Sequence, residues 1–321
     1  MRLTSRAALG LLLLTTVLPD GAMAEERPLK VAIILPGSAS DGTFNAAAVK
    51  AANVVKAHHP QITVSIRENT ALAQTEQAIT DFARDNYEVI VGYGFEFGEV
   101  ATKVHAQFPK AWFVVNTATV AEAPNLASFD CRWPDAGFIA GAVAATVTKR
   151  GAVGTVGAIP VPAIQEYERG FKDGAKRIRP DIKLLSAYVG SWTDVGKAKE
   201  ITLGLIEQGA DVVTATGNES VIGTVQAAKQ KHAMMIGTFF DGAAFAPDTI
   251  VTTAIVNFDA PLEMAIKKIL DGTLEAKPYM LGFGEGALEL ADYRNFSSKI
   301  SADDKQKIQQ LIEDVKAARV P

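Results

Sequence analysis

The chain has 321 residues, of which 48% are hydrophobic and 21% are charged, and its formal net charge is −4. This composition is that of an ordinary globular protein, and the length allows two domains with sizeable cores. The mildly acidic balance argues against nucleic acid or an anionic membrane as a partner. The single cysteine, Cys131, makes no intramolecular disulfide, so stability must come from the core.

The first 24 residues have the pattern of a secretory signal peptide. Arg2 and Arg6 flank the start of the apolar run 7–14, and an Ala-x-Ala cleavage signal ends at Ala24. The apolar run is too short to span a bilayer. We expect cleavage after Ala24 and a mature protein in the periplasm, and the alternative is a buried N-terminal helix. No cysteine lies near the cleavage site, so no lipid anchor is expected.

From residue 29 onward, strand-like apolar runs alternate with helical segments. The run 29–37 is apolar apart from Lys30 and ends in Pro-Gly, as in a strand buried on both faces. The first series has further strands in 62–68, 87–94, 111–117 and 125–132, and helices in 43–60, 71–86, 97–109 and 134–150. The second series has strands in 152–160, 182–191, 210–217, 233–241 and 249–259, and helices in 163–180, 194–209 and 220–232.

This alternation predicts an α/β fold with parallel sheets and right-handed crossovers. Because the order β-α-β-α-β-α occurs twice, we expect two doubly wound lobes rather than one large sheet. In open parallel sheets, ligands bind beyond the carboxyl ends of the strands.

The expected strand ends are rich in aromatic, hydroxyl, amide and aspartate side chains, in the segments PGSASDGTFN, GYGFEFG, NTATV, IPVPAI, GSWTD, TGNES and TFFDG. None of the four histidines lies there, which argues against a His-based triad or a zinc site. The glycine-rich segment 151–160 lacks the full dinucleotide pattern, which argues against a nicotinamide enzyme. We expect no metal and no cofactor.

Several ungapped blocks carry a resemblance to a known family. The segment Ser40–Asn45 stands where members often have an Asp-Lys-Ser-Phe-Asn box, and further blocks follow in order: VGYGFEFGEVATKVHAQFPKAWFVV, GFIAGAVAA, YERGFKDGAK, YVGSWTDVGKAKEI and LGFGEGALEL. Over nearly the whole expected mature chain, the sequence resembles the basic membrane protein family of ABC-transporter solute receptors.

The resemblance implies a type I periplasmic-binding-protein fold that closes around a ligand held between the lobes. It assigns residues 25–131 plus 257–282 to the N-terminal lobe and residues 132–256 plus 283–321 to the C-terminal lobe, after the signal peptide 1–24. Hinges are expected near 131–135, 256–259 and 282–286. The implied partners are a purine-type ligand and an ABC permease in the inner membrane. We expect a monomer that is not an enzyme.

The resemblance also indicates an aromatic sandwich for a purine base. Phe44 and Trp192 would hold its two faces, and Asn45 offers a donor and an acceptor to its edge. The alternatives are a core position for Trp192, a hydrophobic staple for Phe44 and a helix cap for Asn45. The remaining candidates for ligand binding are Asp41, Phe95 (or a core plug), Asn116, Asn218 and Asp241.

The chain departs from the nucleoside-binding pattern at the positions that grip ribose. The Gly-Gly turn is Gly217-Asn218, Phe239 lies at the strand end where relatives place an aspartate, and the lysine position is Val256. Asn116 replaces a further aspartate. A buried sugar would therefore be poorly served by polar partners, and we expect a free purine base in preference to a nucleoside. A nucleoside is the alternative, since Asp241 and Glu219 could still accept from N–H groups of the ligand.

Other functions fit the same sequence. One is a sensing receptor subunit for another small aromatic or sugar-like ligand. Another is a hydrolase on this scaffold, for which Glu96, Glu166 and Asp241 are the only plausible acids. Trp133 lies near an expected hinge and is interpreted as structural.

Overall fold

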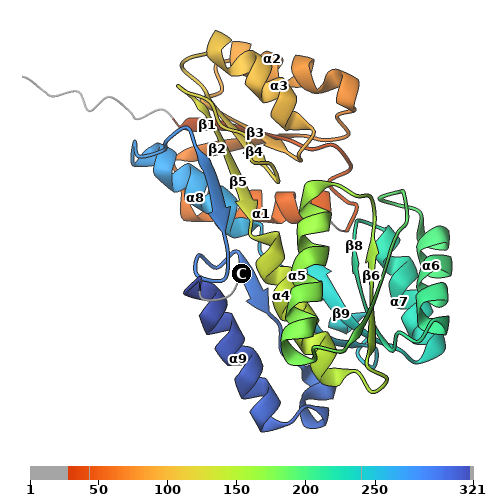
Figure 1. Ribbon diagram of the computed structural model, residues 1–321. Helices are drawn as coiled ribbons and strands as arrows, with labels where there is room; N and C mark the ends of the chain where they lie inside the picture. Colours follow the sequence, from red (N-terminus) through yellow and green to blue (C-terminus); the bar gives the residue numbers. More distant parts are fainter. Residues whose placement is uncertain (1–27, 43, 240, 319–321) are drawn as a thin grey trace, which may run out of the picture.

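The structure is a computed structural model that describes residues 28–42, 44–239 and 241–318. It confirms two α/β lobes with mainly parallel sheets, drawn one above the other in Figure 1. The expected signal peptide lies outside the described residues. In the part of the chain that is described, no helix is long and apolar enough to cross a membrane.

The first lobe contains a six-stranded sheet in the order β11-β5-β4-β3-β1-β2, and all its pairs are parallel. Its strands are β1 (Leu29–Ile34), β2 (Ile62–Arg67), β3 (Val89–Tyr93), β4 (Trp112–Asn116), β5 (Leu126–Cys131) and β11 (Pro278–Leu281). Its helices are α1 (Phe44–His58), α2 (Thr75–Arg84), α3 (Phe97–Val104) and α8 (Asp259–Leu270).

Strand β1 shows why helices cover both faces of this sheet. Val31 and Ile33 belong to the core under α1 and α8, whereas Ala32 and Ile34 belong to the core under α2 and α3. Successive side chains of a strand point to opposite faces. The apolar residues 31–34 of β1 are therefore buried on both faces of the sheet.

The second lobe contains another six-stranded sheet, in the order β12-β10-β9-β8-β6-β7, with β12 antiparallel to β10. Its strands are β6 (Ala152–Gly157), β7 (Lys183–Tyr188), β8 (Val212–Thr216), β9 (Met234–Phe239), β10 (Ile250–Val256) and β12 (Leu288–Leu290). Its helices are α4 (Trp133–Val147), α5 (Pro162–Ile178), α6 (Val195–Glu207), α7 (Ser220–Lys231) and α9 (Ala302–Lys316). Helices α6 and α7 cover one face, and α4, α5 and α9 cover the other (Figure 1).

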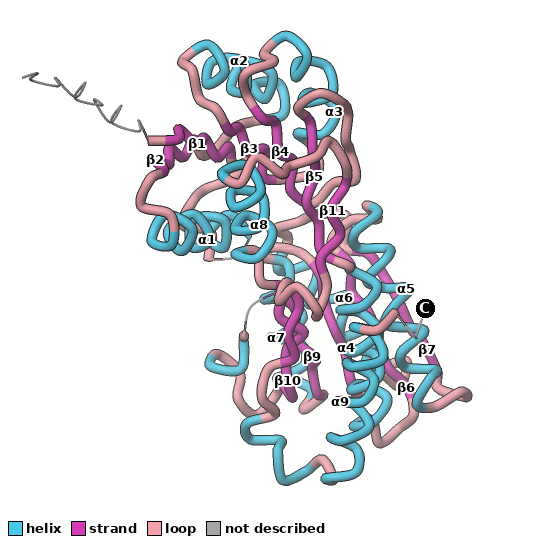
Figure 2. The backbone as a smooth tube through the Cα atoms, turned by 90° about the vertical axis from the view of Figure 1, so that its left-hand side faces the viewer, coloured by secondary structure: helices cyan, strands magenta, loops and turns pink. Residues whose placement is uncertain are grey.

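The chain passes between the lobes three times: from β5 to α4, from β10 to α8 and from β11 to β12. Figure 2 shows β5 and β11 running side by side toward the second lobe. Hydrogen bonds link the passages, since Arg132 N donates to Leu281 O at 2.8 Å and Asn257 N donates to Ala287 O at 2.8 Å. The three passages occur at the segments expected to be hinges; the lobe boundaries and the hinge motion stay predictions.

Candidate functional site

A cavity of about 990 Å³ lies between the carboxyl ends of the strands of the two lobes. Small-molecule sites typically have volumes of roughly 300–1,000 Å³, so this one is at the upper end. Residues from both lobes line it, at positions 36–37, 42, 44–47, 50, 94–96, 117–119, 130, 133, 161–164, 192–193, 217–218, 239, 241, 245, 255–259 and 289. Its position is the one that the strand-end rule predicts.

Four aromatic rings in the lining form a chain of contacts across the two lobes. Phe44, at the start of α1, lies edge-on to Phe258, with ring centroids 5.5 Å apart. Phe258 stacks on Phe239, at the end of β9, with centroids 6.4 Å apart and planes 13° apart. Trp133, at the start of α4, packs edge-on to Phe239 at 5.7 Å. This Phe44–Phe258–Phe239–Trp133 series is the aromatic wall of the cavity.

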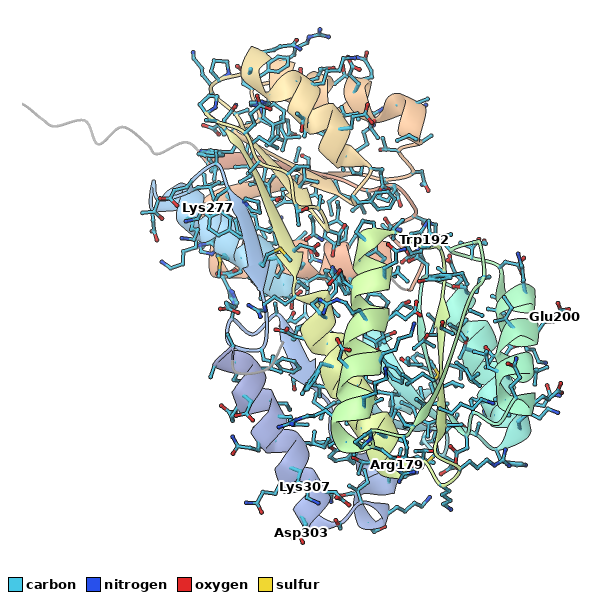
Figure 3. All side chains as sticks on the ribbon, viewed as in Figure 1. Arg179, Trp192, Glu200, Lys277, Asp303 and Lys307 are labelled. Carbon is cyan, nitrogen blue, oxygen red and sulfur yellow. The ribbon has the colours of Figure 1, made fainter. Side chains whose placement is uncertain are left out.

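Trp192 lines the cavity from the second lobe, as predicted, and is only partly buried. Its carbonyl accepts hydrogen bonds from the backbone N–H groups of Asn218 (3.3 Å) and Ser220 (3.1 Å), which ties the loop after β7 to the start of α7. Figure 3 labels it on the edge of the second lobe that faces the first. Within the described residues, no ring contact joins it to Phe44. The two predicted stacking residues therefore both border the cavity without packing on each other.

Asn45 lines the cavity, but its amide is already engaged within the protein. Its Nδ2 donates to Asp41 Oδ2 at 2.8 Å, and its Oδ1 accepts from Gly37 N at 3.2 Å. The Asp41 carboxylate also accepts from the backbone N–H groups of Asn45 and Ala46, at 3.0 and 2.9 Å. Asp41 is outside the lining and caps the first turn of α1. Asp41 therefore orients Asn45 and stabilises the helix end that borders the cavity.

The other candidates are divided between the lining and the core. Phe95, Asn218 and Asp241 line the cavity. Phe95 is 46% exposed, so it is not a core plug. The Asp241 carboxylate pairs with Arg294 and accepts from Ala243 N at 3.1 Å. Asn116 is buried at the end of β4 and is not a lining residue.

Asp130 is a lining residue that sequence reasoning missed. It lies one residue before the end of β5 and is only 5% exposed. Burial raises its pKa to about 7, although hydrogen bonds from Cys131 N and Trp133 Nε1 act in the opposite direction. The signal was present, because an aspartate inside an expected buried strand is unusual. Trp133, interpreted as structural, is buried but also lines the cavity.

Two lining residues at strand ends have positive φ angles. Phe239 has φ = 68° and Thr117 has φ = 60°. A left-handed conformation is uncommon for residues other than glycine and costs on the order of 1–3 kcal/mol when a bulky residue adopts it. Such strain tends to be retained at ligand sites. Both residues border the cavity, and this agrees with a binding role for it.

The charges in the cavity are mainly acidic. The described lining residues include one lysine, Lys50, whose Nζ lies 3.8 Å from Asp259. Burial raises the pKa of the Glu96 carboxyl. The lining carboxyl residues are Glu96, Asp130, Asp241, Asp259 and Glu289. No arginine is among the lining residues that the structure describes. Nowhere in the described ranges do three or more His, Cys, Asp or Glu residues gather as metal ligands.

The comparisons with known proteins give the family. The model of the ABC transporter substrate-binding proteins described as PnrA-like, also called Bmp, matches residues 29–318. The chain belongs to this family. The resemblance to basic membrane proteins predicted from the sequence is thereby confirmed. PnrA-like proteins bind substrates for ABC transporters, and such receptors work outside the cytoplasmic membrane, where they meet a permease.

Relatives of this PnrA-like chain have been given different roles. A purine-binding protein of Brucella abortus is 28% identical over 282 residues, which are 87% of this chain and 80% of the relative. A transcriptional activator protein of Bacillus subtilis is 29% identical over 235 residues, or 73% and 72% of the two chains. The solved structure of an ABC solute-binding protein from Aeropyrum pernix superimposes with a TM-score of 0.80 at 21% identity, covering 92% and 93%, and shows that the fold is shared.

Proposed function

We propose that this PnrA-like protein is the periplasmic receptor of an ABC importer and that it binds a free purine base in preference to a nucleoside. The observation that carries the proposal is the composition of the cavity lining. Phe44 and Trp192 border it from opposite lobes, and the aromatic wall continues from Phe44 to Trp133. The name of the purine-binding relative from Brucella abortus agrees with this ligand class.

A flat heterocycle gains from both rings that border the cavity. Stacking of a nucleobase on an aromatic side chain contributes about 1–3 kcal/mol. A ligand that touches Phe44 in one lobe and Trp192 in the other favours the state in which both contacts form. Capture between two lobes is the physical basis of a receptor that presents its ligand to a permease.

The apolar part of the lining favours a base over a nucleoside. Phe239, Ile255 and Val256 lie together in the cavity, at the ends of the neighbouring strands β9 and β10. Ribose hydroxyls placed against them would lose hydrogen bonds to water without gaining replacements. Among the carboxylates on that side, Asp241 is already paired with Arg294. A base without its sugar avoids this cost.

The rest of the proposal concerns the setting of the protein. We expect a role in binding without catalysis, cleavage after Ala24, no lipid anchor and a monomer in the periplasm. The likeness to ABC substrate-binding proteins over residues 29–318 supports delivery to a permease. Mass spectrometry of the exported chain would show a mature protein that begins at Glu25 and carries no lipid.

The test is isothermal titration of the mature protein after unfolding and refolding to remove carried-over ligand. The titrants are adenine, guanine, hypoxanthine, xanthine, urate and the corresponding nucleosides. We expect at least one base to bind, and its nucleoside to bind at least tenfold more weakly. Equal or tighter binding of the nucleoside would overturn the preference for a free base. Binding of none of these compounds would overturn the purine proposal itself.

A further inference from the structure

Only one of the two Asp130 carboxyl oxygens accepts hydrogen bonds from the rest of the protein. Oδ1 accepts from Cys131 N at 2.7 Å and from Trp133 Nε1 at 2.8 Å. Over the described part of the chain, no hydrogen bond reaches Oδ2. The residue is 5% exposed and lines the cavity. A polar atom without a protein partner, on a largely buried side chain that lines a ligand cavity, is suited to meet the ligand.

A hydrogen bond places the Asp130 carboxyl beside the aromatic wall. The Trp133 ring that donates to Oδ1 packs on Phe239, which stacks on Phe258. All of these residues line the same cavity. A planar ring in contact with the wall would therefore lie next to the Asp130 carboxyl.

The charge balance around Asp130 favours its neutral form. The Nζ of Lys50, the one cation among the described lining residues, lies 3.8 Å from Asp259 Oδ2, and no ion pair in the described part of the chain involves Asp130. In the sheet, Asp130 lies opposite Met280 of β11, which does not titrate. The ionisable groups nearest in sequence are Cys131, Arg132 and Asp135, and Arg132 is paired with Asp135. The other ionisable residues of the cavity are Glu96, Asp241, Asp259 and Glu289. An ionised Asp130 would thus be a buried charge without a cationic partner, which is costly.

We propose that Asp130 recognises the edge of the bound base as a neutral acid, donating a hydrogen bond from Oδ2 to an unprotonated ring nitrogen. This inference rests on the proposed function and specifies that the receptor recognises an unprotonated ring nitrogen of the base. Oδ1 already accepts two N–H donors, so the acidic proton resides on Oδ2. The base must then offer an acceptor there, as adenine does with its unprotonated ring nitrogens.

This arrangement makes binding depend on pH in a defined direction. Burial raises the Asp130 pKa to about 7, and a ligand that needs the proton raises it further in the complex. The affinity for the base is highest about one pH unit or more below 7, where Asp130 is protonated. It falls as the pH rises through 7 and Asp130 of the free protein loses its proton. For a pKa of 7, the protonated fraction falls roughly 30-fold between pH 6 and pH 8.5. The affinity for adenine, which does not titrate in this range, should fall by the same factor.

The discriminating variant is Asp130→Asn. Both partners of Oδ1 are donors, so they hold the amide oxygen of the substituted side chain in place and leave its N–H₂ group where Oδ2 was. The variant is a permanent donor. We expect it to bind adenine within about threefold of the wild type at pH 6 and to show less than a twofold change up to pH 8.5. Asp173→Asn, on the exposed side of α5, serves as the control and keeps the wild-type pH profile.

Titration calorimetry with adenine separates this inference from the proposed function. If the wild type binds no purine, the proposed function fails. If it binds adenine with no pH dependence, or if Asp130→Asn loses more than tenfold at pH 6 while its melting temperature is kept, the donor role is wrong and the receptor function stands. Asp130→Leu, which has no donor, should lose at least tenfold at pH 6. Unchanged affinity in that folded variant would equally overturn the inference.

Discussion

Trp192 is the residue whose role in the site can be tested most directly. It lines the cavity and is only partly buried, and its position depends on backbone hydrogen bonds to its carbonyl. Removal of the indole should therefore spare the loop. We expect Trp192→Ala to weaken binding of a purine base by about 1–3 kcal/mol, or roughly 5- to 150-fold, because the stacking surface is lost. Titration calorimetry measures the change.

Trp112→Ala is the matched control for that substitution. Trp112 begins β4, at the end of the strand opposite the one that faces the cavity, and it is not a lining residue. Its removal should lower the melting temperature through lost packing and leave the affinity within about twofold. If Trp192→Ala binds as tightly as the wild type, stacking on this ring does not hold the ligand.

The sequence predicted those site residues that lie in the segments just after the strands. The strand-end rule located Phe44, Phe95, Trp192, Asn218 and Asp241 at the cavity. It did not separate ligand contacts from supporting contacts, because that depends on hydrogen-bond partners that only the structure supplies. Asp41 and Asn45 illustrate this, since the amide of Asn45 is engaged by Asp41 and Gly37.

Asp130 was missed for a different physical reason. Its segment has the pattern of a buried strand, and the pattern does not reveal that the strand continues into a passage between lobes. The passage brings Asp130 and Trp133 to the cavity together. An aspartate in such a strand can be a structural hydrogen-bond acceptor or a ligand contact. In Asp130, Oδ1 is a structural acceptor.

At the scale of elements, α4 and α5 pack at unusually short range through glycines. A Cβ on Gly137 would lie 2.0 Å from Tyr167 O, and one on Gly141 would lie 1.9 Å from Phe171 O. Side chains at these positions would force the helices apart. Helix α4 also packs against the second sheet and α9. The close approach of α4 and α5 therefore helps to hold these helices on that face of the sheet.

We expect Gly141→Ala to destabilise the protein by about 1–3 kcal/mol or more, because the helices must separate. Intrinsic helix propensity alone would favour alanine by about 1 kcal/mol. Gly204→Ala, in α6, is the matched control, since a Cβ there meets nothing within 4 Å. It should leave stability unchanged or raise it slightly. Chemical denaturation compares the two variants, and equal stabilisation by both would contradict the close-packing account.

The alternation of strands and helices was predictable because the central parallel strands are largely apolar, as in β3, and helices such as α5 are amphipathic. The pattern assigned β1 to β10 and the helices between them with small shifts at their ends. It assigned nothing to β11 and β12, which have four and three residues. Strands that short carry no readable periodicity, and their pairing with β5 and β10 depends on the return of the chain to both lobes.

At the scale of the whole molecule, the cavity has exposed aromatic side chains at its border on each lobe. Phe95 of the first lobe is 46% exposed, and Phe245 of the second lobe is 76% exposed. Large exposed apolar side chains at a binding site mark surface that is covered when the site is occupied. Three passages connect the lobes, and we expect the lobes to approach each other through small backbone changes at those segments.

We therefore expect a purine base to draw the lobes together. The radius of gyration from small-angle X-ray scattering should fall when the base saturates the wild-type protein, because the closed state gains contacts from Phe44 on one lobe and Trp192 on the other. At the same base concentration, Trp192→Ala should remain largely unoccupied and show no contraction. An unchanged radius in a wild-type sample that calorimetry shows to be saturated would mean that the ligand binds within one lobe, and closure would then play no part in presenting it to a permease.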